Sequence, residues 1–549
     1  MSAEIQFLVE KPLSLAYILY MFSGMLLLFS LITGTPDTVA ISRHWHFLSS
    51  DQLEGRGTGT RGERIAGDYL ISQLKAAGLK PVPGLGYEQK IPMHGGIAMP
   101  NSVLTFHSGD SVFQPVLHKD YGTLTTGAST FLPEPTGLVF VGYGIIAPEY
   151  DYNDYQAVDV TGKVVIYLSG EPPSSTAEFF QGPRSTIYSL PAIKHRTAIG
   201  QGAAGTIQIY DPDRDSRSWT AWIRELSFED VIQSYSITSG FSILLHKDQT
   251  GWLFRDSNRT YLELLEQEKR YNLTSFELKT RLSFHGSFRS RDFLSRNILA
   301  VAGDTTDWKN TRLVLVSSHY DHLGIGPAAN RDSIYNGAMD NAIGVAVTLE
   351  LAGILARNPP PVPVLFVFTT GEEKGLLGSI YYTNFPVRPL SSTVACINID
   401  GINFLDPATG YLAIGGIYST LGDLASEALD SHDLTRLTPP SISDDDSFLR
   451  SDHYAFAQAG IPSVSLIEGP GHVNVSEESA QTFKHLWDQT VYHSPFDDSR
   501  QYINWKAVHQ HASVYLSLLN QVTGNPDDVR WYRSSPFRQI RLQTQAENR

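Results

Sequence analysis

The sequence predicts an α/β fold with a mostly parallel, mixed central sheet that helices cover on both faces. After residue 296, short apolar runs alternate with segments whose apolar residues recur at helical spacing, a pattern typical of parallel sheets. Strands are expected at residues 312–316, 362–368, 393–399 and 463–467, and helices at residues 341–356, 375–384, 420–431, 454–459 and 504–519. The texture of the chain changes between about residues 151 and 282, which predicts a second, smaller α+β domain.

The chain is too long for one hydrophobic core, because 549 residues exceed the size at which single cores stop growing. Within the second domain, residues 163–168 and 206–210 are expected to be strands and residues 193–205 a helix. We therefore expect part of the main domain at residues 37–118, an inserted domain at 119–287, the rest of the main domain at 288–525 and a polar, frayed C-terminal tail at 526–549.

The N-terminus predicts export. Residues 13–32 are almost wholly apolar, with Lys11 before them and Gly34-Thr35-Pro36-Asp37 after them. Twenty apolar residues can span a bilayer, and they can equally form the hydrophobic part of a long signal peptide. We expect residues 1–36 to be a signal peptide or an N-terminal membrane anchor, and the protein to be periplasmic or extracellular.

Charge and cysteine content exclude two classes of protein. The 42 basic and 57 acidic residues give a net charge of −15, and no block rich in Lys or Arg stands out, so no nucleic-acid partner is expected. The single cysteine, Cys396, lies inside an apolar run. It excludes disulfides within the chain and is expected to be a small buried hydrophobe.

A glycine-rich stretch at residues 55–60 follows a helical segment near the N-terminus. It lacks the lysine and the preceding strand of a phosphate-binding loop. We therefore interpret this stretch as a structural turn.

Imidazole and carboxylate side chains follow three of the expected strands. These residues are His319, Glu372, Glu373 and Asp400. In open α/β sheets, ligands bind beyond the carboxyl ends of the strands. Asp340 opens an expected helix, and His493 is a later candidate. This donor set without thiolate suits catalytic zinc, or manganese or cobalt, and five ligands are enough for two metals if one carboxylate bridges them.

The neighbours of these residues offer the remaining roles. Asp321 follows His319 by two positions, and its carboxylate can hold the second ring nitrogen of that histidine. Glu372 and Glu373 are adjacent, so their side chains diverge. One of them can bind metal while the other stays free as a general base.

The motif set resembles that of the co-catalytic di-zinc aminopeptidase and glutamate-carboxypeptidase family. The motifs are His319-x-Asp321, Gly337-Ala338-x-Asp340-Asn341, Gly371-Glu372-Glu373-x-Gly375, Asn398-x-Asp400 and Tyr492-His493-Ser494-Pro495. The likeness covers about residues 297–519 and the opening at residues 53–58. Residues 139–210 are similar to the protease-associated domain that many members carry as an insertion.

The resemblance implies a role for each matching residue. One zinc would be held by His319 and Asp400, the second by Glu373 and His493, with Asp340 bridging. Glu372 would be the general base that activates water, and Asp321 would orient His319. The bond from Asp340 to Asn341 would be a cis peptide.

Other polar residues near these motifs have open roles. The segment at residues 451–454 resembles one beside the family's active site, so His453 is a candidate oxyanion donor or substrate contact, as is Tyr492. Asp497 is expected to support the ligands without binding metal. His322 and His472 stay unassigned.

The resemblance predicts a zinc exopeptidase acting on peptides, and we expect an exported aminopeptidase with possible membrane attachment through residues 13–32. A glutamate-type carboxypeptidase or dipeptidase is the alternative and would need a basic pocket for substrate carboxylates. The glutaminyl-cyclase branch uses one zinc, so the full ligand set disfavours it. A non-catalytic, receptor-like relative is disfavoured because all five ligands and the base are present. The oligomeric state is left open.

Overall fold

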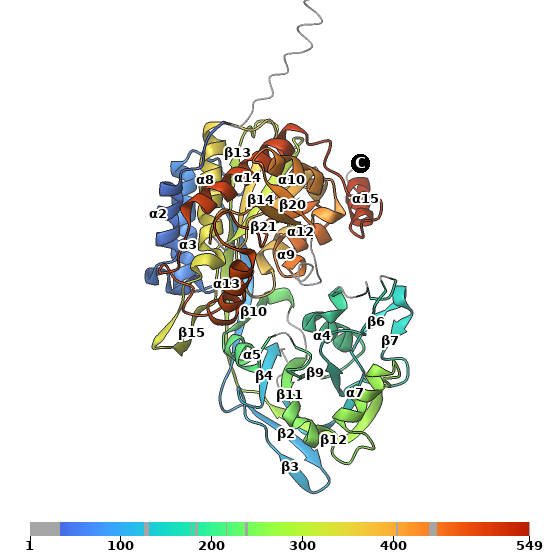
Figure 1. Cartoon of the computed structure of the whole chain (residues 1–549). Helices are drawn as coiled ribbons and strands as arrows, with labels where there is room; N and C mark the ends of the chain where they lie inside the picture. Colours follow the sequence, from blue (N-terminus) through green and yellow to red (C-terminus); the bar gives the residue numbers. More distant parts are fainter. Residues whose placement is uncertain are drawn as a thin grey trace, which may run out of the picture.

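The computed structural model describes residues 33–125, 131–176, 178–180, 182, 185–215, 217–236, 240–401, 405–438 and 447–547. Residues 13–32 lie outside these ranges, so their expected role as a signal peptide or anchor stays a prediction. Two large sheets dominate the described chain, one of nine strands and one of eight (Figure 1). The nine-stranded sheet carries most of the expected site residues.

The nine-stranded sheet is mixed, with a parallel centre. Its order is β10 (Asp230–Gln233), β1 (Glu88–Ala98), β13 (Phe288–Ala302), β17 (Val364–Thr369), β14 (Leu313–His319), β18 (Thr393–Asn398), β21 (Ser463–Glu468), β19 (Gly410–Ile414) and β20 (Thr435–Leu437). Strands β17, β14, β18 and β21 are parallel, whereas the pairs β10–β1, β1–β13, β13–β17 and β21–β19 are antiparallel. The predicted fold class is confirmed.

Helices cover both faces of this sheet. One face carries α2 (Thr38–Leu48), α3 (Arg61–Ala76), α8 (Ile343–Arg357), α10 (Leu421–Asp430) and α14 (Trp505–Gly524), and the other carries α9 (Leu377–Asn384) and α12 (His453–Gln458). Along β14, Val314 packs on the first side and Leu315 on the second, as the two-residue period of a strand requires. Every residue of β14, β17 and β18 is buried, which explains their continuous apolar sequences.

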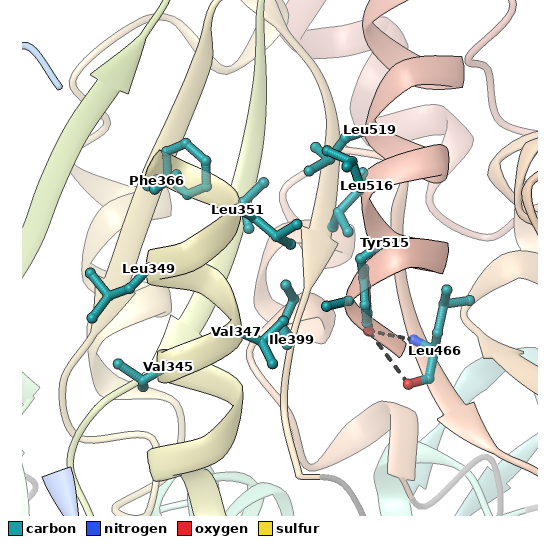
Figure 2. Close-up of a cluster of buried hydrophobic side chains, with 14 of the residues drawn as sticks. Val345, Val347, Leu349, Leu351, Phe366, Ile399, Leu466, Tyr515, Leu516 and Leu519 are labelled. Atoms are coloured by element: carbon teal, nitrogen blue, oxygen red, sulfur yellow. Dashed lines mark hydrogen bonds between the residues drawn. The ribbon is translucent and has the colours of Figure 1, made fainter. Parts of the chain in front are cut away.

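The core of this domain is centred on α8. Figure 2 shows Leu351 of α8 near Phe366 of β17, and Leu516 of α14 on the other side of the cluster. The segment Ala338–Arg357 is long and apolar enough to cross a membrane, but 94% of its apolar window is buried inside the protein. It is therefore the core helix of this domain.

A buried tyrosine links α14 to the strand that leads into the expected site. The hydroxyl of Tyr515 accepts a hydrogen bond from the Leu466 amide at 2.9 Å (Figure 2). It donates one to the Asn398 carbonyl at 2.8 Å. Because Tyr515→Phe leaves both backbone groups buried without this partner, we expect the free energy of unfolding to fall by about 1–3 kcal/mol. Urea titration measures this change. Tyr502→Phe, at a side chain that is 65% exposed, is the control, and equal losses in the two variants would contradict the assignment.

The eight-stranded sheet has a hydrophobic core of its own. Its order is β3 (Ser111–Phe113), β2 (Val103–Ser108), β12 (Phe276–His285), β5 (Phe131–Phe140), β8 (Val164–Leu168), β9 (Gly205–Tyr210), β11 (Phe241–His246) and β4 (Tyr121–Thr125). Its helices include α4 (Pro191–Gly200), α6 (Thr250–Leu253) and α7 (Tyr261–Lys269). The helix expected at residues 193–205 is observed as α4, which ends at Gly200. The chain enters β9 at Gly205.

Strand pairing places the boundary of the inserted domain differently from the expected residues 119–287. Strands β2 and β3 precede residue 119 but belong to the eight-stranded sheet, because β2 pairs with β12 along residues 103–107. Strand β10 lies inside the expected insertion but pairs with β1 at the edge of the nine-stranded sheet. Long-range pairing of this kind leaves no local mark in the sequence.

The C-terminal segment is docked, and the expectation of a frayed tail is wrong for its described part. The helix α15 (Arg538–Glu547) places Arg541 so that its guanidinium donates to the carbonyls of Leu390 and Thr393, each at 2.9 Å. Trp531, which is 6% exposed, donates its indole N–H to the Gly460 carbonyl at 2.9 Å. These contacts could not be predicted from the polar composition of the segment. They are hydrogen bonds from side chains to backbone carbonyls and require no apolar face on the helix.

Candidate metal centre

Three parallel strands bring the expected site residues to one edge of the nine-stranded sheet. Strand β14 ends at His319, β17 is followed by Glu372 and Glu373, and β18 is followed by Asp400. Gly371 makes the turn after β17 with a φ of +65°, a conformation that glycine adopts without steric cost. The carboxyl ends of parallel strands meet at the same edge, so the topology itself assembles this cluster.

His319 lies at the centre of the first group of possible ligands. Its Nε2 atom is 3.0 Å from Oδ1 of Asp400 and 3.2 Å from Oδ1 of Asp340. The histidine is 1% exposed. The hydroxyl of Ser451 donates to the other oxygen of Asp400 at 2.5 Å, which leaves Oδ1 turned to the histidine.

His493 lies at the centre of the second group. Its Nε2 atom is 3.1 Å from Oε2 of Glu373 and 3.4 Å from Oδ2 of Asp340. The two oxygens of Asp340 therefore face two different histidines, as a carboxylate that bridges two metal ions must. The other oxygen of Glu373 lies 2.6 Å from Nδ1 of His322, the histidine that sequence analysis left unassigned.

The residues present fit zinc. Within the described part of the chain, neither ring nitrogen of His493 has a hydrogen-bond partner, although both are buried. A buried nitrogen without a partner carries a desolvation cost that a metal bond offsets. Imidazole and carboxylate donors without thiolate are the set found in catalytic zinc sites.

Hydrogen bonds to the backbone at and before Asp340 hold this residue in place. It lies in the irregular turn η6 (Ala338–Ala342), and the peptide bond from Asp340 to Asn341 is cis, as the resemblance implied. The carboxylate of Asp497 accepts from the amides of Met339 and Asp340 at 2.9 and 3.1 Å. Burial raises the pKa of Asp497 to about 7. Asp497 thus supports the turn, which is the place that sequence analysis gave it.

Asn341 ties the turn η6 to two strand ends. Its side-chain amide donates to the carbonyls of His319 at 3.3 Å and Ile399 at 3.1 Å. These two carbonyls belong to the chain at the ends of β14 and β18. The Asn341 side chain therefore fixes the spacing between the turn that carries Asp340 and the strand ends that carry His319 and Asp400.

Arg56 is a structural residue that sequence analysis missed. It is 1% exposed, and its guanidinium donates to the backbone carbonyls of Leu48, Tyr320, Asn336 and Gly337 at 2.5–2.9 Å. Burial lowers its pKa to about 10. The interpretation of residues 55–60 as a structural turn agrees with this role, and an arginine between two glycines was the available signal.

Glu372 and Glu373 differ in their surroundings. The Glu373 carboxylate faces His322 and His493, whereas no described side chain donates a hydrogen bond to the Glu372 carboxylate. Glu372 still lies beside the cluster, since it, His319 and Glu373 offer ligand atoms within 4.8 Å of one another. Burial raises the pKa of Glu372 well above its ordinary value. Of the two carboxylates, Glu372 is therefore the one whose oxygens are free of described hydrogen-bond donors.

Asp321 supports the turn that carries Glu372. Its carboxylate accepts from the Thr58 hydroxyl at 3.0 Å and from the Glu372 amide at 3.2 Å. Its Oδ1 atom is 3.9 Å from Nδ1 of His319, which is closer, at 3.2 Å, to the backbone carbonyl of Asp321. The expected orientation of His319 thus comes from the Asp321 backbone in this structure.

The remaining candidates lie around the cluster at different depths. His453 is 1% exposed, burial lowers its pKa to about 4, and its Nδ1 atom is 3.5 Å from the side-chain nitrogen of Asn398. The ring of Tyr492 stacks on that of His493 with 3.9 Å between centroids, and burial raises its pKa to about 12. His472 faces the Asp406 carbonyl at 2.9 Å and joins none of the ligand groups.

Comparison with known proteins gives a consistent picture. Residues 297–519 match the family model described as Peptidase family M28. A probable zinc metalloprotease of Pyrenophora tritici-repentis is 29% identical over 203 residues, which are 31% of this chain and 41% of that protein. Aminopeptidase YwaD of Bacillus subtilis is 28% identical over 205 residues, 36% of this chain and 40% of that protein. The chain thus spans about two fifths of the length of these relatives.

Two further matches extend over more of the chain. An aminopeptidase of Pseudomonas aeruginosa is 28% identical over 396 residues, 67% of this chain and 66% of that protein. The solved structure of an aminopeptidase from Aneurinibacillus sp. strain AM-1 has a TM-score of 0.54 at 20% identity and covers 92% of this chain and 96% of that chain. The structural likeness bears on the fold alone.

Proposed function

Because its residues 297–519 match the model of peptidase family M28, we propose that this protein is a zinc aminopeptidase that releases N-terminal residues from peptides. The observation that carries the proposal is the position of Asp340, whose two oxygens face His319 and His493 at 3.2 and 3.4 Å. An adjacent carboxylate, Glu372, is left without a hydrogen-bond donor among the described side chains. This is a layout for water activation between two ions.

Two zinc ions would share Asp340, one with His319 and Asp400 and the other with Glu373 and His493. When bound, they polarise the scissile carbonyl and make the attacking water more acidic. Glu372 takes the proton of that water on a carboxylate oxygen and returns it to the leaving amine. Asp321 holds the Glu372 backbone through its amide, so the carboxylate meets the reacting atoms in one orientation.

The printed names of the relatives, rather than the charge around the cluster, favour an aminopeptidase over a carboxypeptidase. An aminopeptidase binds a free ammonium group, whereas a carboxypeptidase needs cations for substrate carboxylates. The carboxylate of Glu225, in helix α5 (Trp219–Glu225), lies 3.9 Å from His493, and the nearby cation Arg217 is already paired with it. Because Arg217 offsets the charge of the Glu225 carboxylate, this pair favours neither substrate terminus.

Export and the nature of the inserted domain also belong to this proposal. The apolar run at residues 13–32 supports export, with cleavage or retention of that segment as an anchor. The similarity of residues 139–210 to a protease-associated domain supports a role in limiting entry to short peptides. Both ideas are consistent with an exported exopeptidase.

A substrate panel tests the proposed activity. We expect the zinc-loaded protein to hydrolyse aminoacyl-anilides and peptides with free N-termini, and to leave N-blocked peptides intact. Release of the anilide is followed by absorbance, and release of amino acids by chromatography. Cleavage of blocked peptides alone would reject the aminopeptidase assignment. A purified protein that holds no zinc and gains no activity from added zinc would reject the peptidase assignment altogether.

A further inference from the structure

The segment at residues 217–233 connects the two sheets beside the metal centre. It contains α5 and β10, which Figure 1 shows at the junction of the two sheet-containing parts. At its start, the indole of Trp219 donates to the Lys119 carbonyl at 2.9 Å and packs 5.1 Å from the ring of Tyr210, so this end is held by the eight-stranded sheet. At its end, Gln233 pairs with Met93 of β1 and donates to the Leu377 carbonyl at 2.7 Å.

Glu225 lies between these two anchors and faces His493. Its Oε2 atom is 3.9 Å from Nδ1 of the histidine, and Arg217 pairs with the same carboxylate. Nδ1 is buried and lacks a hydrogen-bond partner within the described chain. Among the described residues, Glu225 is the one carboxylate within 4.0 Å of this nitrogen.

The two ring nitrogens of His493 therefore face different groups. Nε2 faces Asp340 and Glu373, where the second zinc is proposed. A histidine binds zinc through a nitrogen without a proton, so its other nitrogen carries the proton and needs an acceptor. The separation of 3.9 Å is roughly 1 Å longer than a hydrogen bond, so the contact proposed here requires the carboxylate to approach Nδ1 by about that distance.

We propose that Glu225 is a positioning residue for His493, and that the inserted part of the chain thereby completes the second metal site. By accepting the proton of Nδ1, Glu225 keeps Nε2 available to zinc and fixes the plane of the ring. Arg217 holds the carboxylate in place. This inference rests on the proposed zinc function. It adds that the affinity for the second zinc ion depends on residues 217–233, which lie outside the region matched by the family model.

Zinc affinity tests the proposal directly. We expect Glu225→Gln and Glu225→Ala to bind one of the two zinc ions about 10- to 100-fold more weakly, measured by competition with a chromophoric chelator. His493→Ala identifies that ion as the second, because it loses the same one. The absorption spectrum of the cobalt-loaded protein is expected to change in Glu225→Gln at the second site only.

The matched control is Glu229→Gln, in the same segment. Glu229 pairs with Arg291 at 2.6 and 2.7 Å and has no contact with His493. The Glu229→Gln variant should bind both ions as the unmodified protein does. In addition, metal-free Glu225→Gln should have the same melting temperature as the metal-free unmodified protein. An equal loss of zinc in Glu229→Gln would mean that the segment acts by general packing, which overturns the proposal.

The outcomes separate this inference from the proposed function. Zinc affinity of Glu225→Ala within twofold of the unmodified protein, with peptidase activity present, overturns the role of Glu225 alone. An unmodified protein that binds no zinc overturns both. Weaker binding of the second ion in both Glu225 variants, with normal binding in Glu229→Gln, supports the inference.

Discussion

Replacing Glu372 by glutamine is expected to lower the turnover number about 10²- to 10⁴-fold while the two zinc ions of the proposed centre stay bound. The amide has nearly the same size as the carboxylate but cannot take a proton. No described side chain donates to the Glu372 carboxylate, so the substitution breaks no hydrogen bond. Steady-state kinetics on an aminoacyl-anilide gives the rate, and metal analysis of the same sample gives the zinc content.

The adjacent glutamate is the control for this result. Glu373→Gln is the same chemical change one residue along the chain, but Glu373 faces His322 at 2.6 Å and His493 at 3.1 Å. We expect this variant to lose affinity for one zinc ion, which excess zinc partly restores. Unchanged turnover in Glu372→Gln, or zinc loss in that variant equal to that of Glu373→Gln, would show that the two roles are assigned the wrong way round.

The central sheet could be predicted because each of its parallel strands is a buried apolar run. The strand expected at residues 393–399 is observed as Thr393–Asn398, and Asp400 follows as expected. His493 is different, since it follows α13 (Glu477–Thr490), a helix in which only Ala480 is buried. Its apolar residues Ala480, Phe483 and Trp487 lie at helical spacing, but no helix was predicted there. Residue type alone made His493 a candidate, and its assignment to the second zinc came from the family resemblance.

The supporting residues depend on contacts between distant parts of the chain. Arg56 and Glu225 reach the centre from the N-terminal turn and from the inserted part, and their partners lie hundreds of residues away in sequence. Hydrophobic periodicity reports which face of an element is buried, and it contains no information on which loop reaches which strand end. The proposed ligands lie at strand ends and in motifs, whereas the residues that support them lie in loops. A single sequence therefore predicts the first set better than the second.

Replacing Asp340 by alanine is expected to weaken the binding of both zinc ions, because its two oxygens face His319 and His493 at 3.2 and 3.4 Å. The loss should exceed the roughly 10- to 100-fold cost of removing a group that only supports a ligand, and peptidase activity should disappear. Zinc titration of the metal-free protein measures both affinities. The variant also changes the charge of a buried cluster, so circular dichroism must show an unchanged fold.

Two single-site variants make the Asp340 result specific. His319→Ala removes a ligand from the first group alone and His493→Ala from the second alone, so each should lower one affinity and spare most of the other. Asp340→Ala should resemble their combination. If it kept one ion at unchanged affinity, Asp340 would belong to a single ion, and the two sites would act as separate centres. A bridging carboxylate instead couples them, so that filling one site orients Asp340 for the other.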